Sequence, residues 1–162
     1  MLSLLPGRRY SRVLDIGCGV GVLTRQLAAS ADHVLGVDIS QVAVDHACRL
    51  SAGRPSVQFE QADLLGLDKT LNQRFDLVVL ADVVYYLAPL SDPVLKSVAR
   101  VVEGLLAADG LVLLVNHDYR RLVPASRTTS QIRDAFRWAP SLQILREQWR
   151  PFYLASILQK QA

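Results

Sequence analysis

Short runs of apolar, often β-branched residues alternate along the chain with longer stretches whose apolar positions recur at helical spacing. This alternation is typical of a parallel α/β sheet, and the run Leu77-Val78-Val79-Leu80 suits a strand that is buried on both faces. The pattern predicts five strands before residue 117, at Arg12–Ile16, His33–Asp38, Ser56–Glu60, Phe75–Ala81 and Gly110–Asn116. It predicts three helices between them, at Gly21–Ala31, Gln41–Ala52 and Asp92–Ala107.

Cap and turn residues set the remaining boundaries. Ser40 is a favourable N-cap for the second helix, and Asp109-Gly110 is expected to end the third. After Asn116 the pattern changes to a polar loop, a helix at Thr129–Trp138 and two strand-like runs, at Leu142–Trp149 and Phe152–Gln159. A tight turn at Arg150-Pro151 predicts that these two runs pair antiparallel at the sheet edge. No repeat or linker interrupts the pattern, so we expect one domain over residues 1–162.

The composition of the chain argues against several classes of protein. The chain has 162 residues, of which 51% are hydrophobic, and this is enough for one domain with a substantial core. Lys and Arg number 18 against 15 Asp and Glu, and no stretch is basic enough to predict a nucleic-acid partner. The amino terminus lacks the features of a secretory leader, and the most apolar stretch is too short to span a bilayer. We therefore expect a cytoplasmic protein without a membrane partner, whereas nothing indicates its oligomeric state.

The two cysteines do not predict a metal or redox site. Cys18 and Cys48 lie thirty residues apart and lack the paired spacing of zinc or thioredoxin-like sites. They are expected to be small packing residues in a reducing compartment. No cluster of His, Asp and Glu at metal-ligand spacing stands elsewhere in the sequence, so no metal is predicted.

A glycine-rich turn follows the first predicted strand and opens the first helix, in the segment Asp15-Ile16-Gly17-Cys18-Gly19-Val20-Gly21. Open α/β sheets bind ligands at this position. A dinucleotide fingerprint would need a glycine at Val22, and a P-loop would need a Gly-Lys-Ser/Thr sequence that does not follow. Asp15 also places negative charge where a pyrophosphate would bind against the helix N-terminus, which argues against a nucleotide phosphate.

Acidic residues recur at the carboxyl ends of the other predicted strands, as Asp38, Asp63 and Asp82. Because ionised carboxylates only accept hydrogen bonds, such a group favours a cationic ligand that is rich in hydroxyl and amine donors. S-adenosylmethionine fits, since it has a sulfonium, an α-amine and a ribose diol but no phosphate. Each of these features alone has a plainer alternative. A glycine turn can simply close a strand-helix corner, and Asp38 can cap a helix.

The predicted roles follow the strand order. The glycines allow the backbone to approach the methionyl part closely, and Asp15 is expected to accept from its amine, directly or through water. Asp38 lies about twenty residues beyond the loop, where this architecture binds a ribose diol, and Asp63 frames the adenine. The predicted cofactor site comprises Asp15, Gly17, Cys18, Gly19, Gly21, Asp38, Ile39, Ala62, Asp63, Leu64 and Ala81.

These residues resemble the motifs of class I S-adenosylmethionine-dependent methyltransferases. The matching segments are Asp15-x-Gly-Cys-Gly-x-Gly21, Gly36-Val37-Asp38-Ile39-Ser40, Gln61-Ala62-Asp63-Leu64, Phe75-Asp76-Leu77-Val78 and Leu106-x-x-Asp-Gly-Leu-Val-Leu113. The resemblance implies a Rossmann-like, doubly wound sheet of seven strands in the order 3-2-1-4-5-7-6, with the last strand antiparallel and helices on both faces. Such enzymes have a helical lid before the first strand, but only about eleven residues precede it here, so we expect the lid to be short or missing.

The segment Ala81-Asp82-Val83-Val84-Tyr85-Tyr86-Leu87 is similar to the NodS-like group, nodulation N-methyltransferases that act on a glucosamine amine. The resemblance implies methyl transfer to a small-molecule acceptor, with an amine expected. Methyl transfer requires alignment of donor and acceptor more than acid-base machinery. We expect Asp82 to take or hold the proton of the amine, Tyr85 or Tyr86 to orient the acceptor, and His117 to be a possible base.

Two other functions stay open. Asp82-x-x-Tyr85 also resembles the signature of seven-strand protein-lysine methyltransferases. A chain that keeps the cofactor crevice but lacks turnover would instead be a binding module, because a fold does not by itself imply a function. The aromatic pair after the fourth strand can equally be packing residues, and a histidine at a strand end is often structural.

Overall fold

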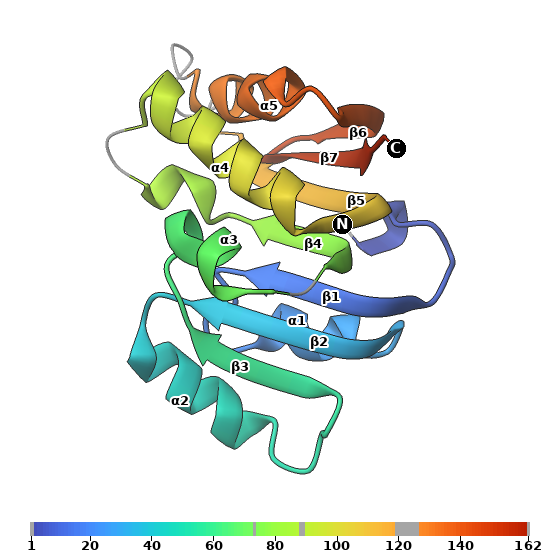
Figure 1. The fold of residues 1–162 in the computed structure, drawn as a ribbon, viewed down its shortest axis with the longest axis vertical. Helices are drawn as coiled ribbons and strands as arrows, with labels where there is room; N and C mark the ends of the chain where they lie inside the picture. The colour runs from blue at the N-terminus through green and yellow to red at the C-terminus, as the bar shows by residue number, and fades with distance from the viewer. Residues whose placement is uncertain (1, 73, 88–89, 119–126, 162) are drawn as a thin grey trace.

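The computed structural model describes residues 2–72, 74–87, 90–118 and 127–161 (Figure 1). In this part of the chain seven strands form one sheet, in the order β3-β2-β1-β4-β5-β7-β6. The strands are β1 Tyr10–Ile16, β2 Ala31–Asp38, β3 Val57–Gln61, β4 Phe75–Ala81, β5 Leu106–His117, β6 Leu142–Arg150 and β7 Tyr153–Lys160. The α-helices are α1 Val22–Leu27, α2 Gln41–Leu50, α3 Leu67–Thr70, α4 Asp92–Leu105 and α5 Thr128–Trp138. Single 3-10 turns lie at η1 Leu2–Leu4, η2 Leu64–Gly66 and η3 Val84–Tyr86.

The strand order confirms the predicted topology. β1, β2, β3, β4 and β5 pair in parallel, whereas β7 is antiparallel to both β5 and β6. Arg150 pairs with Tyr153 at the end of the β6–β7 hairpin, so the predicted tight turn is formed by Pro151 and Phe152, one residue later than expected. β6 is consequently the edge strand on this side of the sheet.

Helices cover both faces of the sheet, with α4 and α5 in front of it and α1 behind it in Figure 1. Side chains alternate between two buried clusters along each central strand. Leu14 packs into the cluster on the α4–α5 side, whereas Val13 packs into the cluster on the α1 side. β5 follows the same rule, because Val112 and Leu114 join the first cluster and Leu113 joins the second. Apolar burial on both faces explains the nearly continuous apolar runs of these strands.

Among the predicted boundaries that differ from the structure, those of α1 and α4 have a clear physical reason. α1 ends at Leu27 because β2 begins at Ala31, and the periodicity of apolar residues did not reveal this short connection. The prediction that Asp109-Gly110 ends the third helix is wrong, because α4 ends at Leu105 and β5 starts at the next residue. Asp109 instead has a φ of 58° inside an irregularity of β5. Phe75 pairs with Leu106 and Leu77 pairs with Leu111, so the extra residues of β5 bulge out between these pairs.

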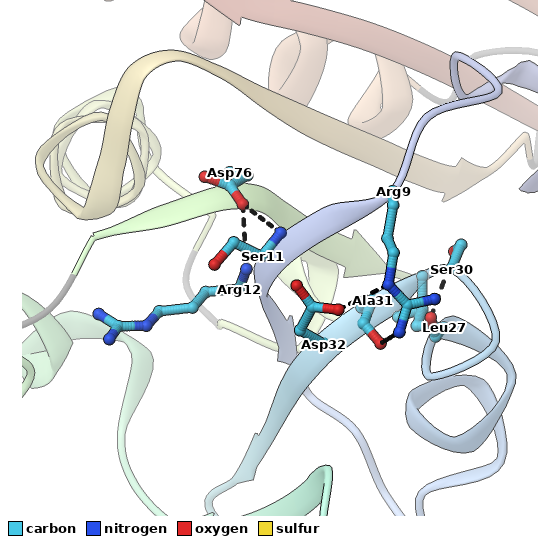
Figure 2. Close-up of polar contacts among 8 residues, drawn as sticks. All are labelled: Arg9, Ser11, Arg12, Leu27, Ser30, Ala31, Asp32 and Asp76. Carbon is cyan, nitrogen blue, oxygen red and sulfur yellow. Dashed lines mark hydrogen bonds and ion pairs between the residues drawn. The ribbon is translucent and has the colours of Figure 1, made fainter.

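The amino-terminal ends of the strands are joined by polar contacts between distant segments (Figure 2). One carboxylate oxygen of Asp76 accepts hydrogen bonds from the backbone N–H groups of Ser11, at 2.5 Å, and Arg12, at 3.0 Å. Arg9 bridges to Asp32, with 2.6 Å between Nε and Oδ1. These contacts connect the starts of β1, β2 and β4, and they give Asp76 of the matched motif a structural role. No helix within the described residues is long and apolar enough to cross a membrane.

Candidate functional site

A cavity of about 440 Å³ opens at the carboxyl-terminal ends of β1, β2, β3 and β4. Apolar side chains form most of its wall, and three carboxylates, those of Asp38, Asp63 and Asp82, stand among them. Its lining residues are Ile16, Gly17, Val37, Asp38, Ile39, Ala62, Asp63, Leu64, Asp82, Val83, Tyr86 and Leu87. The structure therefore brings residues that the sequence places after four different strands into one cavity. Its volume lies within the range of small-molecule binding sites.

The glycine loop forms one wall of this cavity. Gly17, Gly19 and Gly21 all have left-handed backbone conformations, with φ values of 73°, 53° and 77°. L-residues with a Cβ atom adopt this conformation at a cost, whereas glycine does not. At Gly17 space is a second reason, because an added Cβ would lie 2.5 Å from Cγ2 of Val83. The glycine loop thus packs directly against the segment that follows β4.

Asp38 holds the glycine loop to the end of β2. Its Oδ2 accepts a hydrogen bond from the backbone N–H of Gly19 at 2.9 Å, and its Oδ1 accepts one from Ser40 N–H at 2.9 Å. Ser40 in turn caps α2 as predicted, since its Oγ accepts from Ala43 N–H at 3.3 Å. Asp38 is partly exposed at the cavity wall, so its carboxylate faces both the loop and the cavity.

Asp15 lies beneath α1 and does not line the cavity. Only 2% of its surface is exposed, and one carboxylate oxygen accepts a hydrogen bond from Thr24 Oγ1 at 2.7 Å. Burial raises the pKa of Asp15 to about 6, and the Thr24 hydroxyl partly opposes this rise. Cys18 is also buried, and burial together with the nearby carboxylates raises the pKa of its thiol to about 12. These two motif residues belong to the interior of the loop.

Phe59 of β3 supports the glycine loop from the other side. Gly36 of β2 is its register partner, and a Cβ on Gly36 would lie 2.7 Å from the Phe59 ring. A Cβ on Gly21 would lie 2.5 Å from the same ring. The ring therefore fills the space that two motif glycines leave open, which explains the glycine at position 36.

Asp63 and Ala62 form the wall after β3. The backbone N–H of Ala62 donates to the carbonyl of Asp38 at 3.0 Å, which fixes the two strand ends to each other. Asp63 caps η2, because its Oδ1 accepts from Leu65 N–H at 3.1 Å. The side chain of Asp63 is exposed, so it keeps acceptor capacity toward the cavity.

Asp82 and His117 meet at the ends of the neighbouring strands β4 and β5. Oδ2 of Asp82 lies 2.8 Å from Nδ1 of His117, and Oδ1 accepts from the backbone N–H of His117 at 2.8 Å. Asp82 has a φ of 55°, an uncommon conformation for a residue other than glycine. Its own N–H donates to the carbonyl of Val115 at 2.9 Å. Asp82 lines the cavity, and His117 lies beside it with half of its side chain exposed.

The two tyrosines of η3 have different surroundings. Tyr86 lines the cavity and is 75% exposed. Tyr85 is partly buried and packs against the cluster under α4 and α5. Their ring centroids lie 4.5 Å apart with an interplanar angle of 43°. Of the two predicted orienting residues, Tyr86 is therefore the one that the structure places at the cavity.

Several predicted residues stand behind the lining. Cys18, Gly19 and Gly21 shape the loop, and Ala81 packs on the α1 side of β4. Sequence reasoning missed the apolar wall formed by Ile16, Val37, Leu87 and Val83. Ile16 immediately precedes Gly17, and Val37 immediately precedes Asp38. Their place beside predicted site residues was the signal that could have identified them. Nothing in the sequence indicated that Thr24 binds Asp15.

Comparison with known proteins identifies the family. A sequence profile described as a methyltransferase domain matches residues 13–104. The ubiquinone biosynthesis O-methyltransferase of Paracidovorax citrulli is 33% identical over 160 residues, which cover 83% of this chain and 65% of that protein. The chain belongs to the methyltransferase domain family. This confirms the family predicted from the motifs, in which S-adenosylmethionine is the methyl donor.

The comparisons also confirm that this methyltransferase domain resembles the nodulation group, as predicted. Nodulation protein S of Bradyrhizobium diazoefficiens is 30% identical over 97 residues, which cover 59% of the chain and 44% of that protein. The crystal structure of N-methyltransferase NodS from Bradyrhizobium japonicum WM9 has a TM-score of 0.81 at 19% identity. That alignment covers 99% of this chain and 90% of the NodS chain, and it shows a common fold. A further structure of the same protein contains S-adenosyl-L-homocysteine.

The chain spans 65% and 44% of the length of these two curated relatives. What the whole relatives act on therefore carries over to this chain only as a proposal.

Proposed function

We propose that this chain binds S-adenosylmethionine in the cavity at the carboxyl ends of β1, β2, β3 and β4 and transfers its methyl group to a small-molecule acceptor. The observation that carries the proposal is the composition of the cavity wall, which combines three carboxylates with apolar side chains. Carboxylates favour the cationic, donor-rich parts of such a ligand, and the apolar wall suits a purine ring. The same carboxylates would repel a phosphate, which supports this cofactor over a nucleotide.

Residues of the cavity wall and of the glycine loop bind different parts of the cofactor. Asp38 binds the ribose diol, because its carboxylate reaches the cavity while it also fixes Gly19. Ala62, Asp63 and Leu64 frame the adenine, with Ile39 on the rim. The methionyl part lies against the glycine loop, whose backbone allows close approach at Gly17. Asp15 acts from behind the loop, where its charge favours the amine of the ligand.

The bound cofactor supplies a methyl group on a sulfonium, whose sulfur takes the electron pair of the broken C–S bond. The protein aligns the acceptor with that methyl group and excludes water. Asp82, Tyr86 and His117 stand at the cavity or beside it and form the acceptor side, with Tyr85 packed behind them.

The chemical type of the acceptor is a separate proposal. The sequence favours an amine, as in the printed name of the N-methyltransferase NodS. The curated relative from Paracidovorax citrulli is named an O-methyltransferase instead. Protein-lysine transfer and a non-catalytic binding module are the alternatives to a small-molecule enzyme.

Calorimetric titration with S-adenosylhomocysteine tests the cofactor site. The wild-type chain is expected to bind, and Asp38→Ala is expected to weaken binding at least tenfold. Asp45→Ala is the matched control, because Asp45 is an exposed aspartate of α2 that contacts Gln41 at 2.7 Å. Thermal denaturation of all three proteins separates lost binding from lost folding. Unchanged affinity in Asp38→Ala contradicts the proposed site.

Incubation of the chain with methyl-labelled cofactor and a cell extract then tests the activity. Label in the low-molecular-weight fraction supports a small-molecule acceptor. Label in protein supports the lysine alternative, and ligand binding without any transfer of label supports the binding module.

A further inference from the structure

A second hollow lies at the amino-terminal half of β1, β2 and β3, away from the cofactor cavity at the other end of these strands. Its volume is about 210 Å³, and its polar lining residues are Arg12, His33, Ser56 and Gln58. We infer that this hollow is a separate ligand site, which binds a phosphate group, either free or on a small molecule. The inference goes beyond the proposed methyl transfer and does not depend on it.

The strand register brings these polar side chains to one face of the sheet. Arg12 stands two residues before Leu14, which packs on the α4–α5 side, so Arg12 points to that side as well. His33 is the register partner of Arg12. Gln58 is the register partner of Leu35, which also packs on the α4–α5 side. Three adjacent strands thus contribute polar side chains to the same face.

This face is unusual for parallel strands, because helices normally cover both faces of a parallel sheet. α3 has only four residues, and in Figure 1 no described helix lies in front of the amino-terminal half of β1, β2 and β3. On β1 the exposed Arg12 precedes the buried Leu14, and on β2 the exposed His33 precedes the buried Leu35. The face therefore changes from polar to apolar along each strand, and its polar half is open to a ligand.

The hollow offers hydrogen-bond donors and no carboxylate. The guanidinium of Arg12 has five N–H donors, and an imidazole, a hydroxyl and an amide stand beside it. None of the described lining residues is acidic. Among the described residues, no ion pair or hydrogen bond engages the side chain of Arg12 or His33. Such a set favours an oxyanion, because paired guanidinium N–H groups match two phosphate oxygens.

Arg12 is fixed through its backbone, which leaves its charge available. Its N–H donates to Oδ2 of Asp76 at 3.0 Å, while its guanidinium extends away from both Asp76 and Asp32 in Figure 2. Arg9 differs, because its guanidinium contacts the carboxylate of Asp32 and the carbonyl of Ala31. Of these two arginines, Arg12 is therefore the one that is able to bind an external anion.

The size of the hollow limits the ligand. Leu35 and Phe75, which are 6% and 1% exposed, form an apolar base beneath the polar side chains. The volume of 210 Å³ lies below the range of about 300–1,000 Å³ that is usual for drug-sized ligands. A single phosphate with a short carbon chain suits this space, whereas a nucleotide exceeds it.

The hollow is separate from the cofactor cavity although both involve β1 and β2. Arg12 stands four residues before Ile16, and His33 stands four residues before Val37. Ile16 and Val37 line the cofactor cavity. Four residues of strand extend about 13 Å, so a ligand in the hollow lies out of reach of the transferred methyl group. The hollow is therefore a binding site that takes no part in the chemical step.

Proton–nitrogen-15 NMR of the full chain tests the site, with inorganic phosphate and glycerol 3-phosphate as two separate probes. The backbone amide signals of Arg12, His33 and Gln58 are expected to shift to saturation, with Kd in the millimolar range. Arg12→Gln is expected to weaken binding at least about tenfold, because it removes the charged donor. Arg137→Gln is the matched control, since Arg137 is an exposed arginine in the last turn of α5 and does not line the hollow.

The spectrum of each variant also shows whether that variant is folded. Where Arg12→Gln fails to fold, His33→Gln takes its place and is likewise expected to weaken binding. Three results overturn the inference: amide signals that do not saturate, equal shifts with sodium chloride at the same ionic strength, or wild-type affinity in a folded Arg12→Gln or His33→Gln chain. Both outcomes that separate the phosphate sources support the site. Tighter binding of glycerol 3-phosphate assigns it to a phosphate ester, and equal affinity for the two probes assigns it to free phosphate.

Discussion

Gly17 lies so close to Val83 that a methyl group on Gly17 would stand 2.5 Å from Cγ2 and 2.7 Å from Cβ of that valine. The first turn of the glycine loop and the segment after β4 are thus packed in direct contact. Both residues also line the cavity.

Gly17→Ala and Gly19→Ala form a matched pair for this contact. Both residues have positive φ values, but a Cβ on Gly19 meets nothing within 4 Å. Gly19→Ala is expected to lose about 1 kcal/mol of unfolding free energy from backbone strain alone. Gly17→Ala should lose roughly 2–4 kcal/mol, because overpacking is added to the strain. Urea denaturation of the two variants measures the difference, and equal losses would show that Val83 moves aside freely.

Asp15 makes stability depend on pH in a defined direction. Burial raises its pKa from 3.8 to about 6. Between these two pH values the carboxyl group of Asp15 is protonated in the folded chain and ionised in the unfolded chain. Its contribution to stability is complete below pH 3.8 and is lost as the pH rises through about 6. The stability of wild type relative to Asp15→Asn should therefore fall by up to about 3 kcal/mol between pH 4 and pH 7.5. Denaturant titrations at both pH values test this, and a constant difference contradicts it.

The two cysteines should differ in reactivity toward iodoacetamide. Cys18 is buried and the pKa of its thiol is raised to about 12, so almost no thiolate forms at pH 8. Cys48 is exposed on α2. Mass spectrometry of the native chain is expected to find the label on Cys48, with Cys18 modified only after unfolding in urea. Rapid native labelling of Cys18 would mean that the glycine loop opens readily.

Asp76 should contribute to stability without affecting the cavity. Asp76→Ala removes a charged acceptor from two backbone N–H groups of β1 and is expected to cost about 1–3 kcal/mol. Asp32→Ala is the control, because it breaks only the exposed ion pair with Arg9 and should cost less than about 1 kcal/mol. Both variants should retain affinity for S-adenosylhomocysteine. A large loss of affinity in Asp76→Ala would show that the contacts at the amino-terminal ends of the strands influence the cavity at their carboxyl-terminal ends.

Much of the fold follows from local sequence patterns. The bounds of β4 match the prediction, and those of α2 and α5 differ by two residues or fewer at each end. The seven-strand order came instead from the resemblance to a family, since periodicity does not say which strands are neighbours. The bulge at Asp109 depends on the register between β4 and β5, which no local pattern contains.

The site was predicted less completely because contacts between strand ends are not local. Asp38, Asp63 and Asp82 were found from their positions after predicted strands, and all three line one cavity. The pairing of Asp82 with His117 joins residues 35 positions apart and depends on β4 lying beside β5. The burial of Asp15 depends on where α1 places Thr24. Sequence reasoning thus identified the participants, and the three-dimensional arrangement assigned their partners.

The place of β1 between β2 and β4 has a consequence for synthesis of the chain on the ribosome. β2 follows β1 closely in sequence, but the contact of Asp76 with Ser11 spans 65 residues. Until β4 has emerged, one edge of β1 has no strand to pair with, and Leu14 and Ile16 of β1 lack their partners Val78 and Leu80. Unpaired apolar edges of this kind are where nascent chains associate wrongly. Slow translation between residues 16 and 75 would prolong that exposure, so chaperone demand during synthesis should be greatest over this interval.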